Sequence, residues 1–303
     1  MAAPDLEHPA GAHMEVELTS QPDCWERAAE LTGDFELIRQ PGRRVAIVGC
    51  GTSWFVAQSI ATLRENAGLG LTDAFAASEA PLPGRDYDVV IAISRSGTTP
   101  EVSDLLRRIG DSIPTVAIVA DANSPVGELA QDVIELAFAD ESSVVQTRFA
   151  TTVLALARAA MGEDLTGAIE DARAILAEEV PAALVDAEQL TCLGMGWTVG
   201  IAHEAALKMR EASQSWTESY PAMEYRHGPM SIARSGRAVW VFGEAPAALE
   251  AEVARTGAEF VPSRRDPLAE LVRAHRVALL RSRARGLDAD APRHLTRSVI
   301  LAS

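Results

Sequence analysis

Three charged side chains in the second half of the chain share one face of a predicted helix. Glu204, Lys208 and Glu211 lie in the stretch HEAALKMRE. Because successive helical residues are rotated by about 100°, the three lie within roughly 60° of arc. Such a stripe can line a pocket in which a carboxylate moves a proton. It can also be a solvent-exposed ladder of ion pairs worth about 0.2–0.5 kcal/mol each, and the spacing alone leaves both interpretations open.

A second candidate for acid–base chemistry is His227, in the segment SYPAMEYRHGPM that follows this helix. The segment shows little helical or strand periodicity, and its Gly-Pro pair predicts a bend. Imidazole in general changes charge near neutral pH, so a histidine in an irregular loop is a candidate general acid or base. A single histidine is also often structural, and that alternative stays open here.

Hydroxyl and glycine residues gather in two short segments, CGTS (50–53) and SRSGTT (94–99). Each follows an apolar run and opens a predicted helix, where free N–H groups and the positive end of the helix dipole can hold an anion such as phosphate. Alternatively, Thr98 or Thr99 is simply the N-cap of the second helix with Pro100 in its first turn, and Thr98-x-x-Glu101 fits a capping box. The two roles are compatible. Neither segment matches the nucleotide motifs GxxxxGK[ST] or GxGxxG.

The apolar runs that precede these segments predict a parallel sheet. RVAIVG, YDVVIAIS, PTVAIVAD and VIELAF alternate with helical patterns, which is typical of a doubly wound α/β fold. The carboxyl ends of parallel strands meet at one edge, so both hydroxyl segments should lie there. The same plan restarts at QLTCLGMG, which precedes the helix with the charged stripe, and AVWVFG and EFVP are further strand candidates.

These patterns divide the chain into two related halves. We expect a flexible leader at residues 1–14, a first α/β domain at 15–160, a connecting helix at 161–184 and a second, shorter domain at 185–303. One helix is predicted between Met14 and Phe35. The segment HRVALLRSRARGL predicts a basic amphipathic helix, which we interpret as a solvent-exposed face and not as a nucleic-acid element.

Length and composition limit the class of protein. The chain has 303 residues, 48% hydrophobic and 23% charged, as in ordinary globular proteins. A net charge of −16 disfavours broad contact with nucleic acid or an anionic membrane, so an anion must be held by a local site. Three singly scattered cysteines indicate neither a disulfide framework nor a zinc site. Without a secretory signal or a long apolar run, we expect a cytoplasmic protein that binds no membrane.

Together these motifs resemble the sugar isomerase (SIS) family, specifically the isomerase half of glucosamine-6-phosphate synthase and the stand-alone amino-sugar-phosphate deaminases and isomerases. The resemblance extends from about residue 20 to the end, through six ordered motifs: VGCGTSW, AISRSGTT, SVVQTRFATT, EAALKMRE, ESYPAMEYRHGP and PRHLTRSV. It implies two flavodoxin-like SIS subdomains, each a parallel sheet flanked by helices in three α/β/α layers. It also implies a homodimer with sites near the subunit boundary, a phosphorylated sugar substrate, no cofactor and no metal.

The resemblance also implies roles for particular residues. Glu211 is expected to move a proton between C1 and C2 of the sugar, and His227 to open the sugar ring, in its own site or in that of the neighbouring subunit. Glu204 and Lys208 are the supporting charged pair. The residues expected to hold the 6-phosphate are Thr52, Ser53, Ser94, Arg95, Ser96 and Thr99, and those expected to contact the rest of the substrate are Val144 and Arg297 of the closing tail.

Two differences from the synthase pattern reduce the number of reactions that the chain is expected to catalyse. We expect no glutaminase domain with its terminal cysteine before the first SIS unit, because only a short leader stands there and residue 2 is Ala. The tail has Arg297 where the synthase pattern has a lysine that forms a Schiff base, and arginine stays protonated. The sequence therefore favours a metal-independent deaminase or isomerase of a 6-phosphorylated amino sugar, such as glucosamine 6-phosphate. The alternatives are a plain aldose-ketose isomerase of a sugar 6-phosphate and a non-catalytic sugar-phosphate-binding regulator.

Overall fold

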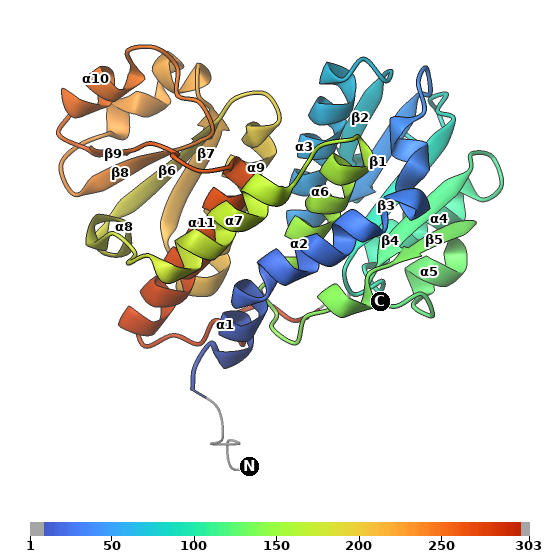
Figure 1. Ribbon diagram of the computed structural model, residues 1–303, viewed down its shortest axis with the longest axis horizontal. Helices are drawn as coiled ribbons and strands as arrows, with labels where there is room; N and C mark the ends of the chain where they lie inside the picture. Colours follow the sequence, from blue (N-terminus) through green and yellow to red (C-terminus); the bar gives the residue numbers. More distant parts are fainter. Residues whose placement is uncertain (1–8, 298–303) are drawn as a thin grey trace.

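Two parallel sheets lie on either side of a shared layer of helices in the computed structural model, which describes residues 9–297 (Figure 1). The first sheet has five strands in the order β2-β1-β3-β4-β5 and the second has four in the order β7-β6-β8-β9. The strands are β1 (Val45–Gly49), β2 (Thr72–Ala76), β3 (Val89–Ser94), β4 (Thr115–Val119), β5 (Asp132–Glu135), β6 (Gln189–Gly194), β7 (Trp216–Pro221), β8 (Arg237–Phe242) and β9 (Glu259–Val261).

Both sheets have the same topology. All neighbouring strands are parallel, and the second sheet repeats the flavodoxin-like order of the first without its last strand. The predicted α/β fold with two such units is confirmed. In the first sheet the strand order reverses between β1 and β3, and ligands of doubly wound folds bind at this switch point.

The helices cover both faces of each sheet. They are α1 (Ala12–Thr19), α2 (Gln21–Glu30), α3 (Thr52–Asn66), α4 (Pro100–Ile109), α5 (Pro125–Leu129), α6 (Arg148–Ala160), α7 (Thr166–Ala177), α8 (Ala182–Asp186), α9 (Thr198–Ser213), α10 (Leu249–Ala254) and α11 (Pro267–Ala284). Alternate residues of β1 enter different cores: Val45 and Ile47 face the helices between the sheets, whereas Ala46 and Val48 face the outer helices. Within residues 9–297, no helix is both long and apolar enough to cross a bilayer.

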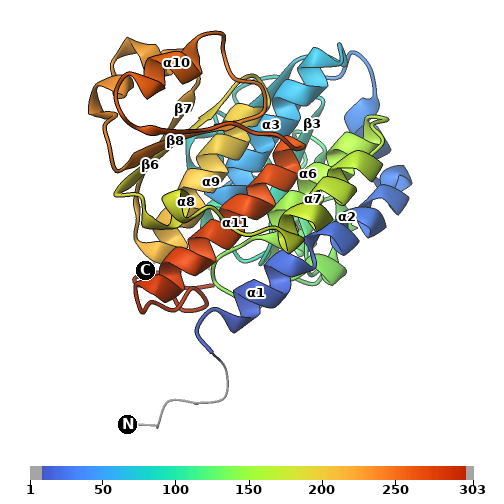
Figure 2. The ribbon, with the colours of Figure 1, turned by 60° about the vertical axis from the view of Figure 1, so that its left-hand side comes forward.

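The two units meet where α3 packs against α9 in the shared layer (Figure 2). A Cβ atom on Gly200 would lie 2.3 Å from the carbonyl oxygen of Phe55, so this close approach requires glycine. At the other end of the contact, Gly51 at the start of α3 lies beside Leu207 near the end of α9. The helices are therefore antiparallel, and the carboxyl edge of the first sheet lies beside the C-terminal end of α9.

Four elements differ from the sequence-based expectations. Helix α1 begins at Ala12 and Met14 is fully buried, so the expected flexible leader of 1–14 already contains ordered helix; residues 1–8 of that leader lie outside the described residues. The single helix expected before residue 35 is two helices, α1 and α2. Strands β2 and β7 were not predicted. Both are edge strands, whose polar residues give no continuous apolar run.

The basic helix near the C-terminus is also different from its prediction. Helix α11 begins at Pro267 and packs between α9 and α7, and most of its residues are buried. Its arginines have internal partners: Arg281 is fully buried and donates to the backbone carbonyls of Leu184, Val185 and Ala187. The interpretation as a solvent-exposed face was therefore wrong, because carbonyl groups of a neighbouring segment take the place of water.

Candidate active site

The two hydroxyl segments lie side by side at the carboxyl edge of the first sheet. The segment after β1 leads into α3 at Thr52, and the segment after β3 leads into α4 at Pro100; β1 and β3 are neighbours. Gly97 has φ +62°, and a Cβ atom there would lie 1.9 Å from the Ser124 hydroxyl oxygen, so only glycine fits this turn. The N-termini of α3 and α4 therefore both lie at the carboxyl edge of the first sheet.

A cavity of about 170 Å³ opens at this edge and is closed by the end of α9 and by the C-terminal tail. Of the predicted site residues, the lining includes Thr52, Ser96, Thr99, Val144, Lys208, Glu211 and Arg297. Sequence reasoning missed Cys50, Gly51, Gln146, Leu295 and Thr296. All five lie inside the sequence motifs named above, and this position in a motif is the signal that could have identified them. Among residues 9–297, Gln146 Oε1 has no hydrogen-bond partner, so its amide is a ready acceptor for a ligand hydroxyl.

Some of the predicted phosphate-binding hydroxyls are buried beside the cavity, and others line it. Ser53 and Ser94 are buried and do not line the cavity, and the Ser94 hydroxyl bonds to that of Thr99 at 3.1 Å. Ser96 Oγ accepts hydrogen bonds from both the backbone N–H (3.2 Å) and the hydroxyl (3.0 Å) of Thr98. Since these use its acceptor sites, the Ser96 hydroxyl proton is free to donate into the cavity. Thr98 therefore orients Ser96.

The cap of α4 differs from the predicted capping box. Thr99 is the N-cap residue, its side chain makes no capping hydrogen bond, and Pro100 is in the first turn. The predictions that Thr99 is the N-cap and that Pro100 lies in the first turn are confirmed, whereas Thr98 bonds to Ser96 and does not cap. The first N–H groups of α4 have no side-chain acceptor at the N-cap and are available to an anion.

The charged stripe of α9 is buried at one end and reaches the cavity at the other. Glu204 and Lys208 are 1% exposed and the Glu211 side chain is 21% exposed. Lys208 Nζ contacts Glu211 Oε2 directly and lies 3.7 Å from Glu204 Oε1. Burial acts to lower the pKa of Lys208, but the two carboxylates outweigh it and raise that pKa. A surface ladder is excluded, and buried charges of this kind are typical of functional sites.

Arg95 has a different set of partners from the predicted phosphate contact. It is 1% exposed and does not line the cavity. Its guanidinium donates to the backbone carbonyls of Glu141 at 3.1 Å, Ser143 at 3.0 Å and Arg297 at 3.1 Å. Because backbone carbonyls take these donors, Arg95 joins the segment before α6 to the C-terminal tail. The Arg297 side chain pairs with both carboxylate oxygens of Asp140 at 2.8 Å.

His227 lies far from Glu211 within one chain. It ends the short 3-10 helix η4 (Glu224–His227) after β7 and is exposed. Ala222 in the same loop donates to the carbonyl of Gly194 at the end of β6, so this loop is at the carboxyl edge of the second sheet. Glu211 is near the other end of α9, about 20 Å along the helix from its start. The chain therefore does not bring its own His227 to its own cavity.

Glu17 of α1 holds the segment before α6 by accepting from the N–H groups of Ser142 and Ser143. Burial and the nearby charge of Glu141 raise the pKa of Glu17 to about 7. The folded state therefore binds more protons than the unfolded state between pH 4.5, the ordinary value, and about 7, and stability increases as pH falls through this window. We expect the Tm of the protein to rise from pH 8 to pH 5.

Substitution of this carboxyl tests the expectation. Glu17→Gln should remove most of the rise in Tm between pH 8 and pH 5, measured by calorimetry. The control is Glu15→Gln on the same helix. Its pKa is lowered by Arg283, so Glu15 stays ionised across the window and its loss should leave the slope unchanged. An unchanged slope in Glu17→Gln would contradict the assignment.

Comparison with known proteins identifies relatives of this chain. The SIS domain model matches residues 37–161. The glutamine–fructose-6-phosphate aminotransferase of Methanothermobacter thermautotrophicus is 31% identical over 212 residues, which cover 64% of this chain and 35% of that protein. The chain spans 35%, 51% and 42% of the first three curated relatives. It is therefore similar to part of each.

Solved structures share the whole fold. The glucosamine-6-phosphate deaminase of Thermotoga maritima has a TM-score of 0.77 at 23% identity, covering 95% of this chain and 100% of that one. The tagatose-6-phosphate ketose/aldose isomerase of Escherichia coli has a TM-score of 0.77 at 20% identity, covering 94% and 98%. At these identities the likeness is one of fold.

Proposed function

Residues 37–161 of this chain belong to the SIS domain family, and we propose that the chain is an enzyme that deaminates or isomerises a 6-phosphorylated amino sugar by proton transfer between C1 and C2. The observation that carries the proposal is Glu211, a partly exposed carboxylate that contacts a buried ammonium group and shares a cavity with two helix N-termini. A carboxylate base and an anion-binding edge are the two parts that this reaction needs.

The phosphate would bind at the starts of α3 and α4, where Thr52, Ser96 and Thr99 line the cavity. The chain has a net charge of −16, so the attraction for the phosphate anion must come from this local set of N–H groups and hydroxyls. Phosphate binding then fixes the far end of the sugar against Glu211. Gln146, whose amide oxygen has no hydrogen-bond partner within residues 9–297, would accept a hydrogen bond from a sugar hydroxyl.

Proton transfer by Glu211 accounts for both activities. With an aldosamine phosphate, Glu211 takes the proton at C2, electrons move into an enaminol, and reprotonation at C1 leaves an imine at C2. Water adds to the imine and ammonia leaves, which gives the ketose phosphate. Lys208 stays protonated beside the base and stabilises negative charge as it develops. Without a nitrogen substituent the same transfer is a plain aldose-ketose isomerisation.

A panel of phosphorylated sugars in D2O tests the proposal and separates it from its alternatives. Glucosamine, galactosamine and unsubstituted hexose 6-phosphates are followed for ammonia release and for loss of the C2 proton signal. Release together with exchange supports the amino-sugar enzyme, and exchange without release supports the plain isomerase. Binding of these compounds with neither reaction would mean a sugar-phosphate-binding protein and would reject the enzyme.

Lys208 is the only lysine in the sequence, and this makes covalent catalysis testable. A Schiff base needs a neutral amine, whereas Lys208 is buried and its pKa is raised by the carboxylates beside it. We predict that borohydride reduction in the presence of fructose 6-phosphate adds no sugar to Lys208, as measured by peptide mass. A reduced adduct at Lys208 would contradict a noncovalent mechanism, and modification of the terminal amine serves as the internal control for reagent activity.

We further propose that His227 acts in the site of a second copy of the chain, since it is exposed and distant from its own Glu211. Glu211→Gln and His227→Asn should each be inactive alone. Mixed by co-expression, they should recover up to about a quarter of wild-type activity, because half of the dimers are hybrids and each hybrid has one intact site. No recovery would contradict a shared site. The double variant co-expressed with wild type is the control, since its hybrids contain no intact site.

A further inference from the structure

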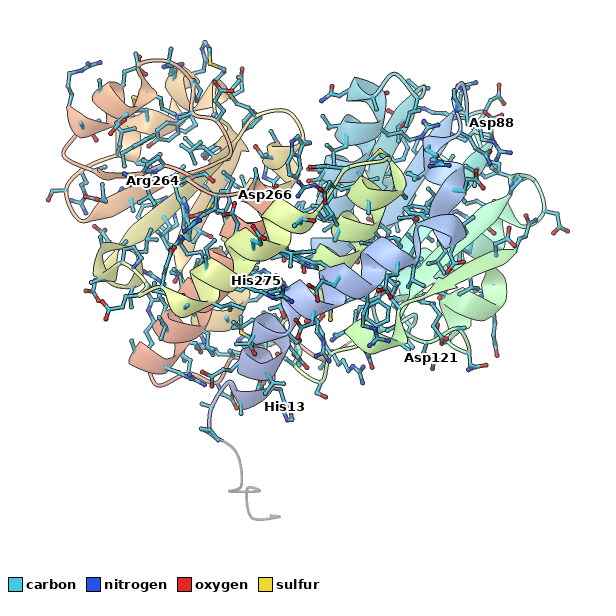
Figure 3. The ribbon with its side chains drawn as sticks, viewed as in Figure 1. His13, Asp88, Asp121, Arg264, Asp266 and His275 are labelled. Carbon is cyan, nitrogen blue, oxygen red and sulfur yellow. The ribbon has the colours of Figure 1, made fainter. Side chains whose placement is uncertain are left out.

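His275 of α11 is fully buried in the helical layer between the two sheets (Figure 3). It is not part of the cavity lining, and the proton transfer described above does not use it. Its two ring nitrogens face different partners. Nδ1 lies 3.2 Å from Gln21 Nε2 of α2, and Nε2 lies 3.8 Å from Glu204 Oε1 of α9. It therefore connects the buried end of the charged stripe to the N-terminal helices.

A chain of hydrogen bonds fixes which nitrogen of His275 carries the proton. The Trp25 indole can only donate and does so to the Thr151 hydroxyl at 3.1 Å. Thr151 donates in turn to Gln21 Oε1 at 2.8 Å. The Gln21 amide nitrogen donates to the carbonyl of Leu18 at 3.0 Å, which excludes the flipped amide, because that would place two oxygens face to face.

This direction makes Nδ1 of His275 an acceptor from Gln21, so a neutral ring has its proton on Nε2, facing Glu204. Burial lowers the pKa of His275, which supports the neutral ring. Neither carboxylate oxygen of Glu204 has a hydrogen-bond partner among residues 9–297. The 3.8 Å contact is longer than a hydrogen bond, so the two groups interact as an N–H dipole and a charge.

We propose that His275 is a positioning residue for the proposed proton transfer: its Nε2–H holds the buried Glu204 carboxylate toward Lys208, so that the Lys208 ammonium is shared between Glu204 and Glu211. Without this N–H, Glu204 can turn away and Lys208 pairs with Glu211 alone, which makes Glu211 a weaker base. The ionisable groups that act on His275 are Glu204 and Lys208 of α9 and Glu141 of the segment before α6. The inference rests on the role proposed for Glu211.

Two substitutions of His275 separate a positioning role from packing. His275→Leu removes the N–H that faces Glu204, so Lys208 pairs with Glu211 alone and kcat falls by about tenfold. KM changes little because the proposed phosphate-binding edge is elsewhere. His275→Gln keeps an N–H at this position and should restore the wild-type kcat. A wild-type kcat in His275→Leu would overturn the proposal.

The tautomer of His275 can be measured by NMR whether or not the protein shows enzyme activity. In ¹⁵N spectra of the full chain labelled at histidine, the signal of His275 is the one of six that disappears in His275→Gln. We expect a protonated, pyrrole-type Nε2 and a pyridine-type Nδ1 at neutral pH. The opposite tautomer would overturn the proposal even if His275→Leu failed to fold. If the wild-type chain lacks exchange activity but shows this tautomer, the proposed function fails and the hydrogen-bond chain stands.

Discussion

Glu211→Gln is expected to reduce C2 proton exchange by about 10³-fold or more, with the affinity for a sugar 6-phosphate changed by less than about threefold. The amide has nearly the shape of the carboxylate but cannot accept the proton. The proposed phosphate contacts lie at the starts of α3 and α4, whereas Glu211 is on α9. Binding and chemistry should therefore separate in this one variant, measured by calorimetric titration and by exchange in D2O.

A control variant and two contradicting outcomes make this prediction testable. Glu128→Gln is the matched control, since Glu128 is an exposed carboxylate of α5 and lies outside the cavity lining; its exchange rate should equal that of the wild type. Wild-type exchange in Glu211→Gln would show that another group takes the proton. Loss of phosphate affinity together with exchange would show that Glu211 shapes the cavity and would also contradict its assignment as the base.

Arg95→Met is expected to cost about 3 kcal/mol of unfolding free energy and to raise KM by about tenfold. Methionine keeps the length of the side chain but leaves the carbonyls of Glu141, Ser143 and Arg297 without their donor. The tail residues Leu295 to Arg297 line the cavity, so loss of their anchor exposes the site to water. Denaturant unfolding and limited proteolysis at the C-terminus measure the two effects.

The control for Arg95 comes from the other anchor of the same tail. Arg297→Met removes only the half-exposed pair with Asp140, worth at most about 1 kcal/mol, and leaves the backbone carbonyl that Arg95 binds. Its unfolding free energy should therefore stay near that of the wild type. An Arg95→Met variant as stable as Arg297→Met, with its tail equally resistant to protease, would show that Arg95 does not anchor the tail.

The sequence predicted the interior of the fold better than its edges. Strands β1, β3, β4, β6 and β8 are fully buried, so their residues form the continuous apolar runs that a sequence search finds. Edge strands β2 and β7 contain partly exposed polar residues and have no such run. The prediction of a solvent-exposed α11 was wrong because its arginines suggested contact with water, whereas buried backbone carbonyls can accept the same hydrogen bonds.

The candidate site was predictable where function follows from local position. Thr52, Ser96 and Thr99 stand at strand ends and helix starts, and the stripe of α9 follows from helical spacing. Arg95 and His275 could not be assigned in this way, because their partners are 202 and 254 residues away in the sequence. Contacts of that range depend on tertiary packing and leave no spacing signal. The boundaries of the two domains remain a prediction.

The measurement that tests the central claim most directly is exchange of the C2 proton of glucosamine 6-phosphate in D2O, followed by ¹H NMR with the wild-type chain. We predict saturable loss of the C2 proton signal that Glu211→Gln abolishes, with release of ammonia. Tight binding of the compound without any exchange at C2, or exchange that persists in Glu211→Gln, would contradict proton transfer by Glu211.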